Sequence, residues 1–280
     1  MPAVTKQMYS GNTLTPFSGR LVGAHQKIDR LARKALPPLI KRPHFFPKIT
    51  TILHFEGVGG PDAIKRKSPA VDEPWHYFNP FDDTDNQLLE LIAEHYKKLV
   101  KALKDRDEVR AGFEAAWLAH AMVDGLTPAH HYPYEEKLIE LRGEGIENRT
   151  TLREKMFMPG DTRRERMTKN WKMWGAKGLF STHFMFEWGV AAVLAPLSLK
   201  NINVNEDDIA EMLAENLPTW FTRRARQVAG MGMYDAYYRH GWTMPLARQV
   251  RNQLAPLLVQ TVTLTWYRAA VDAGLVENKS

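Results

Sequence analysis

Apolar residues recur at helical spacing along most of the chain. The stretches with this spacing are residues 24–40, 85–105, 109–126, 179–195, 205–241 and 244–274. Because side chains three and four positions apart share one face of a helix, the pattern predicts helices that each bury one face. Strand patterns are scarce. We therefore expect an all-α protein, a single-domain helical bundle that spans residues 1–280.

Prolines, glycines and capping residues predict where these helices begin and end. Pro37 and Pro38 should end the first helix, and Pro218 and the glycines should divide 205–241 into shorter helices. Pro256 predicts a bend in the last helix. Asp85 is placed to cap the helix that follows it.

Two segments depart from the helical pattern. Residues 41–84 are rich in proline and glycine, which predicts long ordered loops with little regular structure. Residues 135–172 are rich in charge, which predicts an exposed insertion. Long loops inside a compact helical domain are usually functional, so both segments are candidates for a functional role.

Composition narrows the chemistry. The chain has 38 Lys and Arg against 32 Asp and Glu, a net charge of +6, which fits an anionic partner. It has no cysteine, which excludes disulfides, zinc–thiolate sites, iron–sulfur clusters and a cysteine nucleophile. Any metal must therefore be held by His, Asp and Glu.

The pattern of apolar runs also bears on location. No run reaches the roughly 18 apolar residues of a membrane span, so no transmembrane segment is expected. The first residues lack the apolar core of a signal peptide. We expect a cytoplasmic protein as the sequence is written, or a secreted one if a leader has been removed.

Two apolar helices each carry a histidine and a carboxylate four positions apart. His120 and Asp124 share one face of the helix predicted at 109–126, and His183 and Glu187 share one face of that at 179–195. A hydrogen-bonded pair is one explanation of each. A shared divalent cation is the other, because unpaired buried charge is strongly unfavourable and imidazole with carboxylate suits zinc.

Further residues extend this pattern into an ordered set. His25 lies at a helix start, Asp62 follows Gly59, Gly60 and Pro61, His76 lies in "WHYFNP", and His130 follows Asp124 after five residues. In this order, with His183 and Glu187, the chain resembles the zinc-dependent phospholipase C family, which is related to the fungal single-strand-specific zinc nucleases. The resemblance covers residues 20–190 and implies a helical bundle of that type.

The resemblance implies two to three zinc ions with a defined ligand set. The first ion would be held by Asp62, His76, His120 and Asp124, the second by His130, His183 and Glu187, and the third by His25 and a bridging Asp124. Two features depart from the family pattern. Secreted members complete the third site with an N-terminal Trp, whereas no Trp precedes Trp75 here, and the insertion 135–172 lengthens the interval between His130 and His183.

The resemblance also implies an activity: metal-dependent hydrolysis of phosphodiesters, in which a zinc-activated water attacks a phospholipid. Asp62 would be the catalytic base, and the protein would contact a membrane surface transiently. Ala63 and Glu73 stand where choline-preferring members have aromatic residues. The presence of Glu187 rather than Asp favours this activity over a nuclease.

Two alternatives stay open at this point. One is a hydrolase of the same fold that acts on single-stranded nucleic acid or small phosphoesters. The mixtures of basic and aromatic residues at 163–174 and 220–227 would serve nucleic acid, although solvated helix faces explain them more simply. The other alternative is a catalytically inactive zinc-binding protein.

Other titratable residues near these motifs receive simpler interpretations. His44, His95 and His240 lie outside the pattern and are expected to form surface or core hydrogen bonds. His54 and Glu56 are weak candidates for contacts behind the ligands. His131 adjoins His130 without an assigned role.

Overall fold

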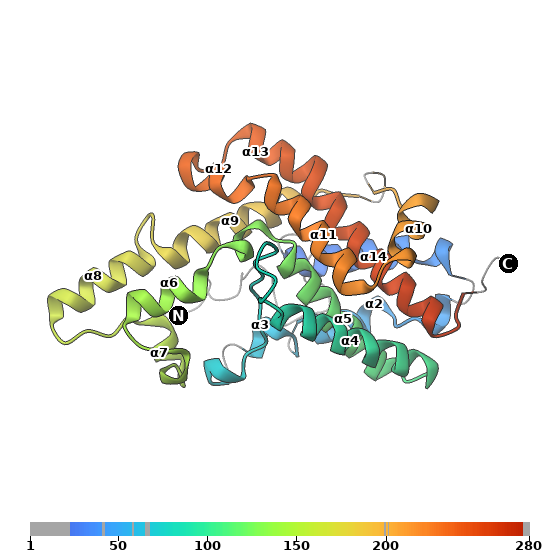
Figure 1. Ribbon diagram of the computed structural model, residues 1–280, viewed down its shortest axis with the longest axis horizontal. Coiled ribbons are helices and arrows are strands. Elements are labelled where there is room, and N and C mark those ends of the chain that lie inside the picture. Colours follow the sequence, from blue (N-terminus) through green and yellow to red (C-terminus); the bar gives the residue numbers. More distant parts are fainter. Residues whose placement is uncertain are drawn as a thin grey trace.

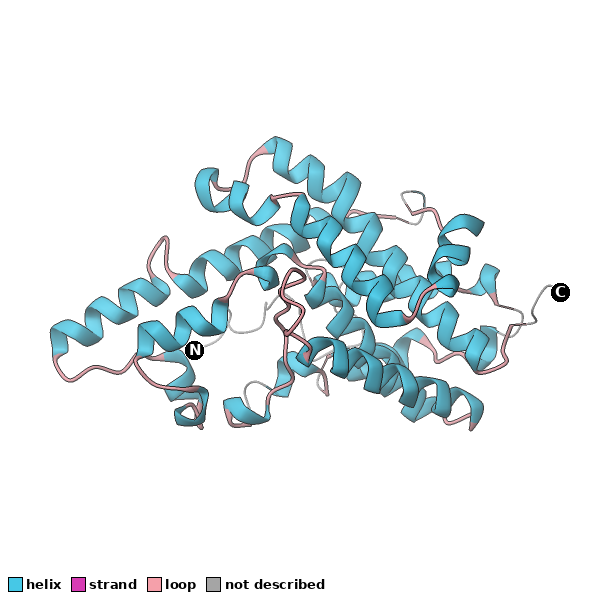
Figure 2. Cartoon of the chain, in the orientation of Figure 1, coloured by secondary structure: helices cyan, strands magenta, loops and turns pink. Residues whose placement is uncertain are grey.

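The computed structural model describes residues 23–40, 43–57, 59–64, 68–198, 200 and 202–276. In these ranges all regular structure is helical and no strand occurs (Figure 2). The prediction of an all-α protein is therefore confirmed for this part of the chain.

The centre of the bundle is α5 (Glu108–Gly125), which packs against α4 (Gln87–Lys104) and α2 (Ile49–Glu56). The side chain of Asp107 caps α5 by accepting a hydrogen bond from the backbone N–H of Arg110. Small residues let α2 approach closely, because a Cβ atom at Gly112 would lie 2.6 Å from Thr51 Cγ2. This close packing fixes the side chains that α2 and α5 direct at each other.

The first and last helices pack together against the central helix. These are α1 (Ala24–Ala35) and α14 (Ala255–Asp272), and both contact α5. The last helix departs from regular α-helical geometry just before Pro256, where the sequence predicts a bend. A stretch of π-helix, Val250–Leu254, separates α13 (Met244–Gln249) from α14, and the wider turn accommodates the missing N–H and the ring of the proline.

The segment 179–241 supplies the other long helices of the bundle. They are α9 (Leu179–Leu194), α10 (Glu206–Ala214), α11 (Leu217–Gly230) and α12 (Met233–His240). Pro218 lies in the first turn of α11, where the missing N–H has no intrahelical partner to lose. The predicted breaks near Pro218 and the glycines are confirmed.

Two details of the sequence-based prediction are wrong. The segment 41–84 contains a regular helix, α2, followed by the short α3 (Pro61–Ile64). Its β-branched residues disfavour a helix, but Ile52 and Leu53 are fully buried, so packing overrides local propensity. Asp85 does not cap α4. Its Oδ2 accepts a hydrogen bond from the backbone N–H of Asn79 at 2.8 Å, which pins the preceding loop.

The insertion is helical as well as exposed. It contains α6 (Tyr134–Arg142), α7 (Leu152–Met156) and α8 (Arg163–Trp174), which form one end of the molecule (Figure 1). A small core of its own holds it together, made of Tyr134, Leu138, Met158 and Met173. Short helices of the 3-10 type also occur among the described residues, at Pro37–Leu39, Pro43–Phe45, Ala70–Asp72, Pro128–His131 and Ile146–Asn148. None of the helices described is both long and apolar enough to cross a membrane.

Candidate metal centre

The eight residues of the predicted ligand set converge in the interior. They come from α1, α3, the loop before α4, α5, the 3-10 helix Pro128–His131 and α9, and all are buried. Their nitrogen and oxygen atoms form three groups, each with its atoms within 4.8 Å of one another. The groups are His25, Asp62 and His120; His76, His120 and Asp124; and His130, His183 and Glu187.

Asp124 lies at the centre of the cluster. Its Oδ2 is 2.5 Å from His76 Nδ1 and 3.1 Å from His120 Nε2. Its Oδ1 is 3.4 Å from His25 Nε2 and 3.6 Å from His130 Nδ1. One carboxylate thus faces four imidazoles, which is the position that a bridging ligand requires.

The electrostatics of Asp124 and His120 follow from this arrangement. Burial by itself would raise the pKa of Asp124, but the histidines around it, His120 first, hold that pKa well below its usual range. Burial would lower the pKa of His120, yet Asp124 and Glu56 outweigh it and raise that pKa well above its usual range. The site therefore favours a negative carboxylate beside positive charge, on imidazolium or on a cation.

A second group lies between α9 and the 3-10 helix. Glu187 Oε1 is 2.7 Å from His130 Nε2 and 3.0 Å from His183 Nε2. His130 Nδ1 donates a hydrogen bond to the carbonyl oxygen of His76 at 2.7 Å, which directs Nε2 toward Glu187. Burial would raise the pKa of Glu187, but His183 and His130 lower it to about 2.

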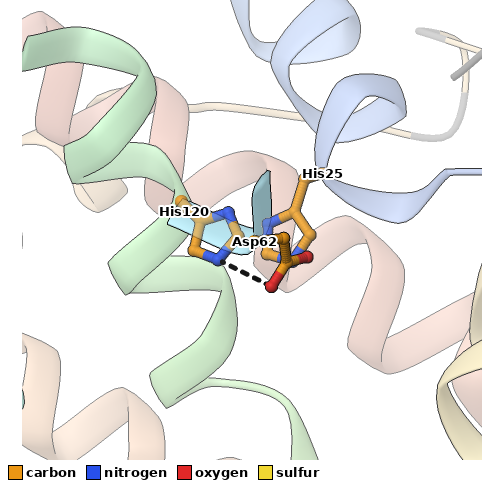
Figure 3. Close-up of side chains that lie close together, drawn as sticks. All are labelled: His25, Asp62 and His120. Atoms are coloured by element: carbon orange, nitrogen blue, oxygen red, sulfur yellow. Dashed lines mark ion pairs between the residues drawn. The ribbon is translucent and has the colours of Figure 1, made fainter. Parts of the chain in front are cut away.

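The third group joins α1, α3 and α5, whose side chains point toward one another (Figure 3). The rings of His25 and His120 stack with centroids 4.0 Å apart, and Asp62 Oδ1 lies 3.9 Å from His120 Nε2. A glycine turn places Asp62 there. A Cβ atom at Gly60 would lie 2.2 Å from the carbonyl oxygen of Glu56, so only glycine lets α3 follow α2 so tightly.

Two further carboxyl groups, of Glu56 and Asp29, are buried near His120. Glu56, fully buried, accepts a hydrogen bond from His120 Nδ1 at 3.1 Å, which directs His120 Nε2 toward Asp62 and Asp124. Burial, and then the charge of Glu56, raise the pKa of Asp29 well above its usual range. Sequence reasoning left Glu56 as a weak candidate and missed Asp29. The sequence did contain a signal for Asp29, because Asp29 follows His25 by four positions, as Asp124 follows His120.

Replacing Glu56 with Gln is expected to weaken zinc binding by about 10- to 100-fold. An amide accepts the Nδ1–H bond less strongly than a carboxylate and holds the imidazole less firmly. The affinity is measured by competition with a chromogenic chelator. His54→Gln is the control, because His54 lies on the same helix and is exposed. Equal affinities of the two variants would remove Glu56 from the site.

The remaining histidines lie outside the cluster. His95 is buried and its Nδ1 lies 2.5 Å from Glu114 Oε2, a core hydrogen bond as predicted. His44 and His240 are exposed. His131 Nε2 donates a hydrogen bond to the carbonyl oxygen of Gly125 at 2.9 Å, where α5 ends.

The buried, neutral imidazole of His131 predicts that the free energy of unfolding depends on pH. Burial lowers its pKa to about 4, below the ordinary value of 6.5. The unfolded chain then binds the proton first as pH falls, so the stabilisation is complete above pH 6.5 and is lost toward pH 4, by up to about 3 kcal/mol. His131→Gln should lose less stability than the parent between these pH values in urea unfolding. Identical losses would contradict the assignment.

The chemistry of the donors fits metal ions. The set contains five imidazoles and three carboxylates, and nitrogen and oxygen ligands without sulfur suit zinc. Ligands at about 2.0–2.1 Å from a tetrahedral ion lie about 3.3 Å apart, close to the spacing seen around Asp124. The group of His130, His183 and Glu187 matches one implied by the resemblance. His25, by contrast, groups with Asp62 and His120 and also contacts Asp124.

No family model matches the chain, and no curated protein matches it. The resemblance to zinc-dependent phospholipases C therefore stays a prediction that depends on the order and the geometry of these eight residues.

Proposed function

We propose that the chain is a zinc-dependent phosphodiester hydrolase of the phospholipase C type. The observation that supports this most is the convergence of three groups of ligating side chains around the single carboxylate of Asp124. Bound zinc would lower the pKa of a water molecule toward ~7 and offset the negative charge of a phosphodiester.

The residues of the site differ in solvent exposure, and we assign their roles from this difference. Asp124 is 1% exposed and would hold the ligands together, whereas Asp62, His183 and Glu187 are each 8% exposed and lie nearer the solvent. A substrate would therefore meet these three side chains before Asp124, and Asp62 is the one among them that the resemblance makes the base. Its carboxylate would orient the attacking water and accept its proton, as the resemblance implies for this position.

The surroundings of the site bear on the substrate. Ala63 is buried, and the Glu73 carboxylate pairs with Lys155. Neither residue supplies an aromatic face for a quaternary ammonium. The substrate that we propose is therefore a phospholipid whose headgroup is not choline.

The nuclease alternative loses one of its two mixtures of basic and aromatic residues, that at 220–227, whereas Trp171 in the mixture at 163–174 is 72% exposed. Trp220 and Phe221, the aromatic residues of the mixture at 220–227, are fully buried. Arg224 lies over the Trp220 ring at 4.6 Å, so this cation stacks within the core. These aromatic rings are not available to stack on bases.

Elemental analysis for zinc, run beside a hydrolysis panel, tests the proposal. The panel contains several phospholipids, single-stranded DNA and an aryl phosphodiester. Two or more tightly bound zinc ions with phospholipid hydrolysis are expected. Fewer than two ions would overturn the proposal, hydrolysis of DNA alone would favour the nuclease, and zinc without turnover would favour an inactive zinc-binding protein.

A further inference from the structure

The outer face of α8 exposes a stripe of large apolar side chains. Met167 is 65% exposed, Trp171 72% and Trp174 37%, and their spacing of four and seven positions places them on one side of the helix. Side chains of this size in contiguous exposed positions mark an interaction surface. The stripe belongs to the insertion and takes no part in the metal centre.

Cations flank this stripe on both sides. The helix carries five basic residues and one acidic residue. That acidic residue, Glu165, pairs with Lys169 on the inner side. The other four, Arg163, Arg164, Arg166 and Lys172, are exposed, and within the described ranges no carboxylate pairs with them. At 100° per residue, Arg163 and Arg166 lie on one side of the stripe, and Arg164 and Lys172 on the other.

A shallow cavity of about 370 Å³ lies on the same helix, beside the stripe. Its lining combines cationic side chains with hydroxyl groups: Thr162, Arg164, Glu165, Thr168, Lys169 and Lys172. Arg and Lys with hydroxyl donors are the groups that bind a phosphate. The apolar stripe thus has a phosphate-compatible border.

The helix is held firmly in this position. Asn170 bonds both the backbone N–H and the carbonyl of Met158, each at 3.2 Å, and Met173 is buried in the small core. The indole N–H of Trp174 donates to the carbonyl oxygen of Met156 at 2.8 Å. The helix lies at one end of the molecule (Figure 1). The inner face and the edge of Trp174 are therefore already packed, whereas Met167 and Trp171 stay exposed.

We propose that the outer face of α8 docks on an anionic phospholipid surface, with Met167 and Trp171 inserted among the lipids and the four cations on the headgroups. Exposed Met and Trp side chains between Arg and Lys can lie in a membrane interface, with the apolar groups among the lipids and the cations on anionic headgroups. The charge of this face is complementary to anionic lipids. The proposal concerns binding alone and does not depend on hydrolysis at the metal centre.

Vesicle sedimentation tests the docking. Vesicles of phosphatidylcholine alone are compared with equal parts of phosphatidylcholine and phosphatidylserine, with the Asp62→Asn chain as parent so that hydrolysis does not consume the lipid. We expect binding to the anionic vesicles that weakens as salt rises. Trp171→Ala should weaken it about tenfold, and the double change Arg164→Glu with Lys172→Glu about 25-fold or more.

Matched substitutions elsewhere control for general effects. Tyr238→Ala removes an aromatic residue of α12 that is 55% exposed, and Lys101→Glu reverses an exposed charge on α4. Neither should change vesicle binding. The proposal is overturned if the α8 variants bind like these controls, or if neutral and anionic vesicles bind equally. It is also overturned if single-stranded DNA, not vesicles, is retained through Arg164 and Lys172.

Discussion

Replacing Asp124 with Asn is expected to remove tightly bound zinc and to lower phosphodiester hydrolysis by about 10³-fold or more. The substitution keeps the shape of the side chain but removes the charge that lies between His76, His120, His25 and His130. An amide cannot bridge two cations as a carboxylate does. The ligand groups that meet at Asp124 should therefore all lose their zinc. Zinc is counted by elemental analysis, and turnover is followed with an aryl phosphodiester.

The chain offers a matched control for this experiment. Glu114 lies on the same helix as Asp124, is fully buried, and pairs with His95 and Arg110 instead of the cluster. Glu114→Gln disturbs a buried histidine–carboxylate pair to a similar extent and should lower the free energy of unfolding without loss of zinc. If Asp124→Asn keeps two or more zinc ions, or if Glu114→Gln loses them equally, Asp124 is not the bridging ligand.

The cluster was predictable from the sequence because helical spacing reports which side chains share a face. His120 with Asp124, and His183 with Glu187, needed only the separation of four positions in apolar surroundings. Which helices bring their pairs together is not contained in that spacing. It came from the resemblance, and the structure brings the same eight side chains together.

The contacts behind the ligands were harder to predict for a physical reason. Glu56 meets His120 across 64 positions of sequence, and it lies on a helix whose β-branched residues favour extended structure. Only the close packing of α2 on α5 at Gly112 shows that this helix forms and which face it directs inward. Local patterns predict elements well, whereas tertiary packing decides such exceptions.

For the insertion, the sequence predicted the exposure of the segment but not its internal packing. Charge alone predicted that 135–172 is exposed, and most of its residues are. The small core of Tyr134, Leu138, Met158 and Met173 was not predicted, because its apolar residues are too sparse to give a clear period. For the same reason the sequence did not predict the stripe that contains Met167 and Trp171. From the sequence, 163–174 is interpreted as a solvated helix face, and only the structure shows that two large apolar side chains are exposed on it.

Asp62→Asn is expected to lower kcat by about 10²- to 10⁴-fold while KM changes little. The amide oxygen still offers a donor atom beside His120, but an amide does not accept a proton at neutral pH, so the loss should fall on the proton-transfer step. The greater exposure of Asp62 relative to Asp124 fits a residue that meets the substrate. Turnover and zinc content are measured on the same preparations.

The outcome separates the two roles that the resemblance gives to Asp62. Loss of kcat with the zinc at His130, His183 and Glu187 retained supports proton transfer, because that group lies apart from Asp62. Loss of zinc in proportion to activity would make Asp62 a ligand without a separate role in proton transfer. Asp72→Asn, an exposed aspartate ahead of His76, should leave both measurements unchanged. Full activity of Asp62→Asn would exclude this side chain as the base. The proton would then have to pass to another carboxylate near the solvent, and Glu187 is as exposed as Asp62.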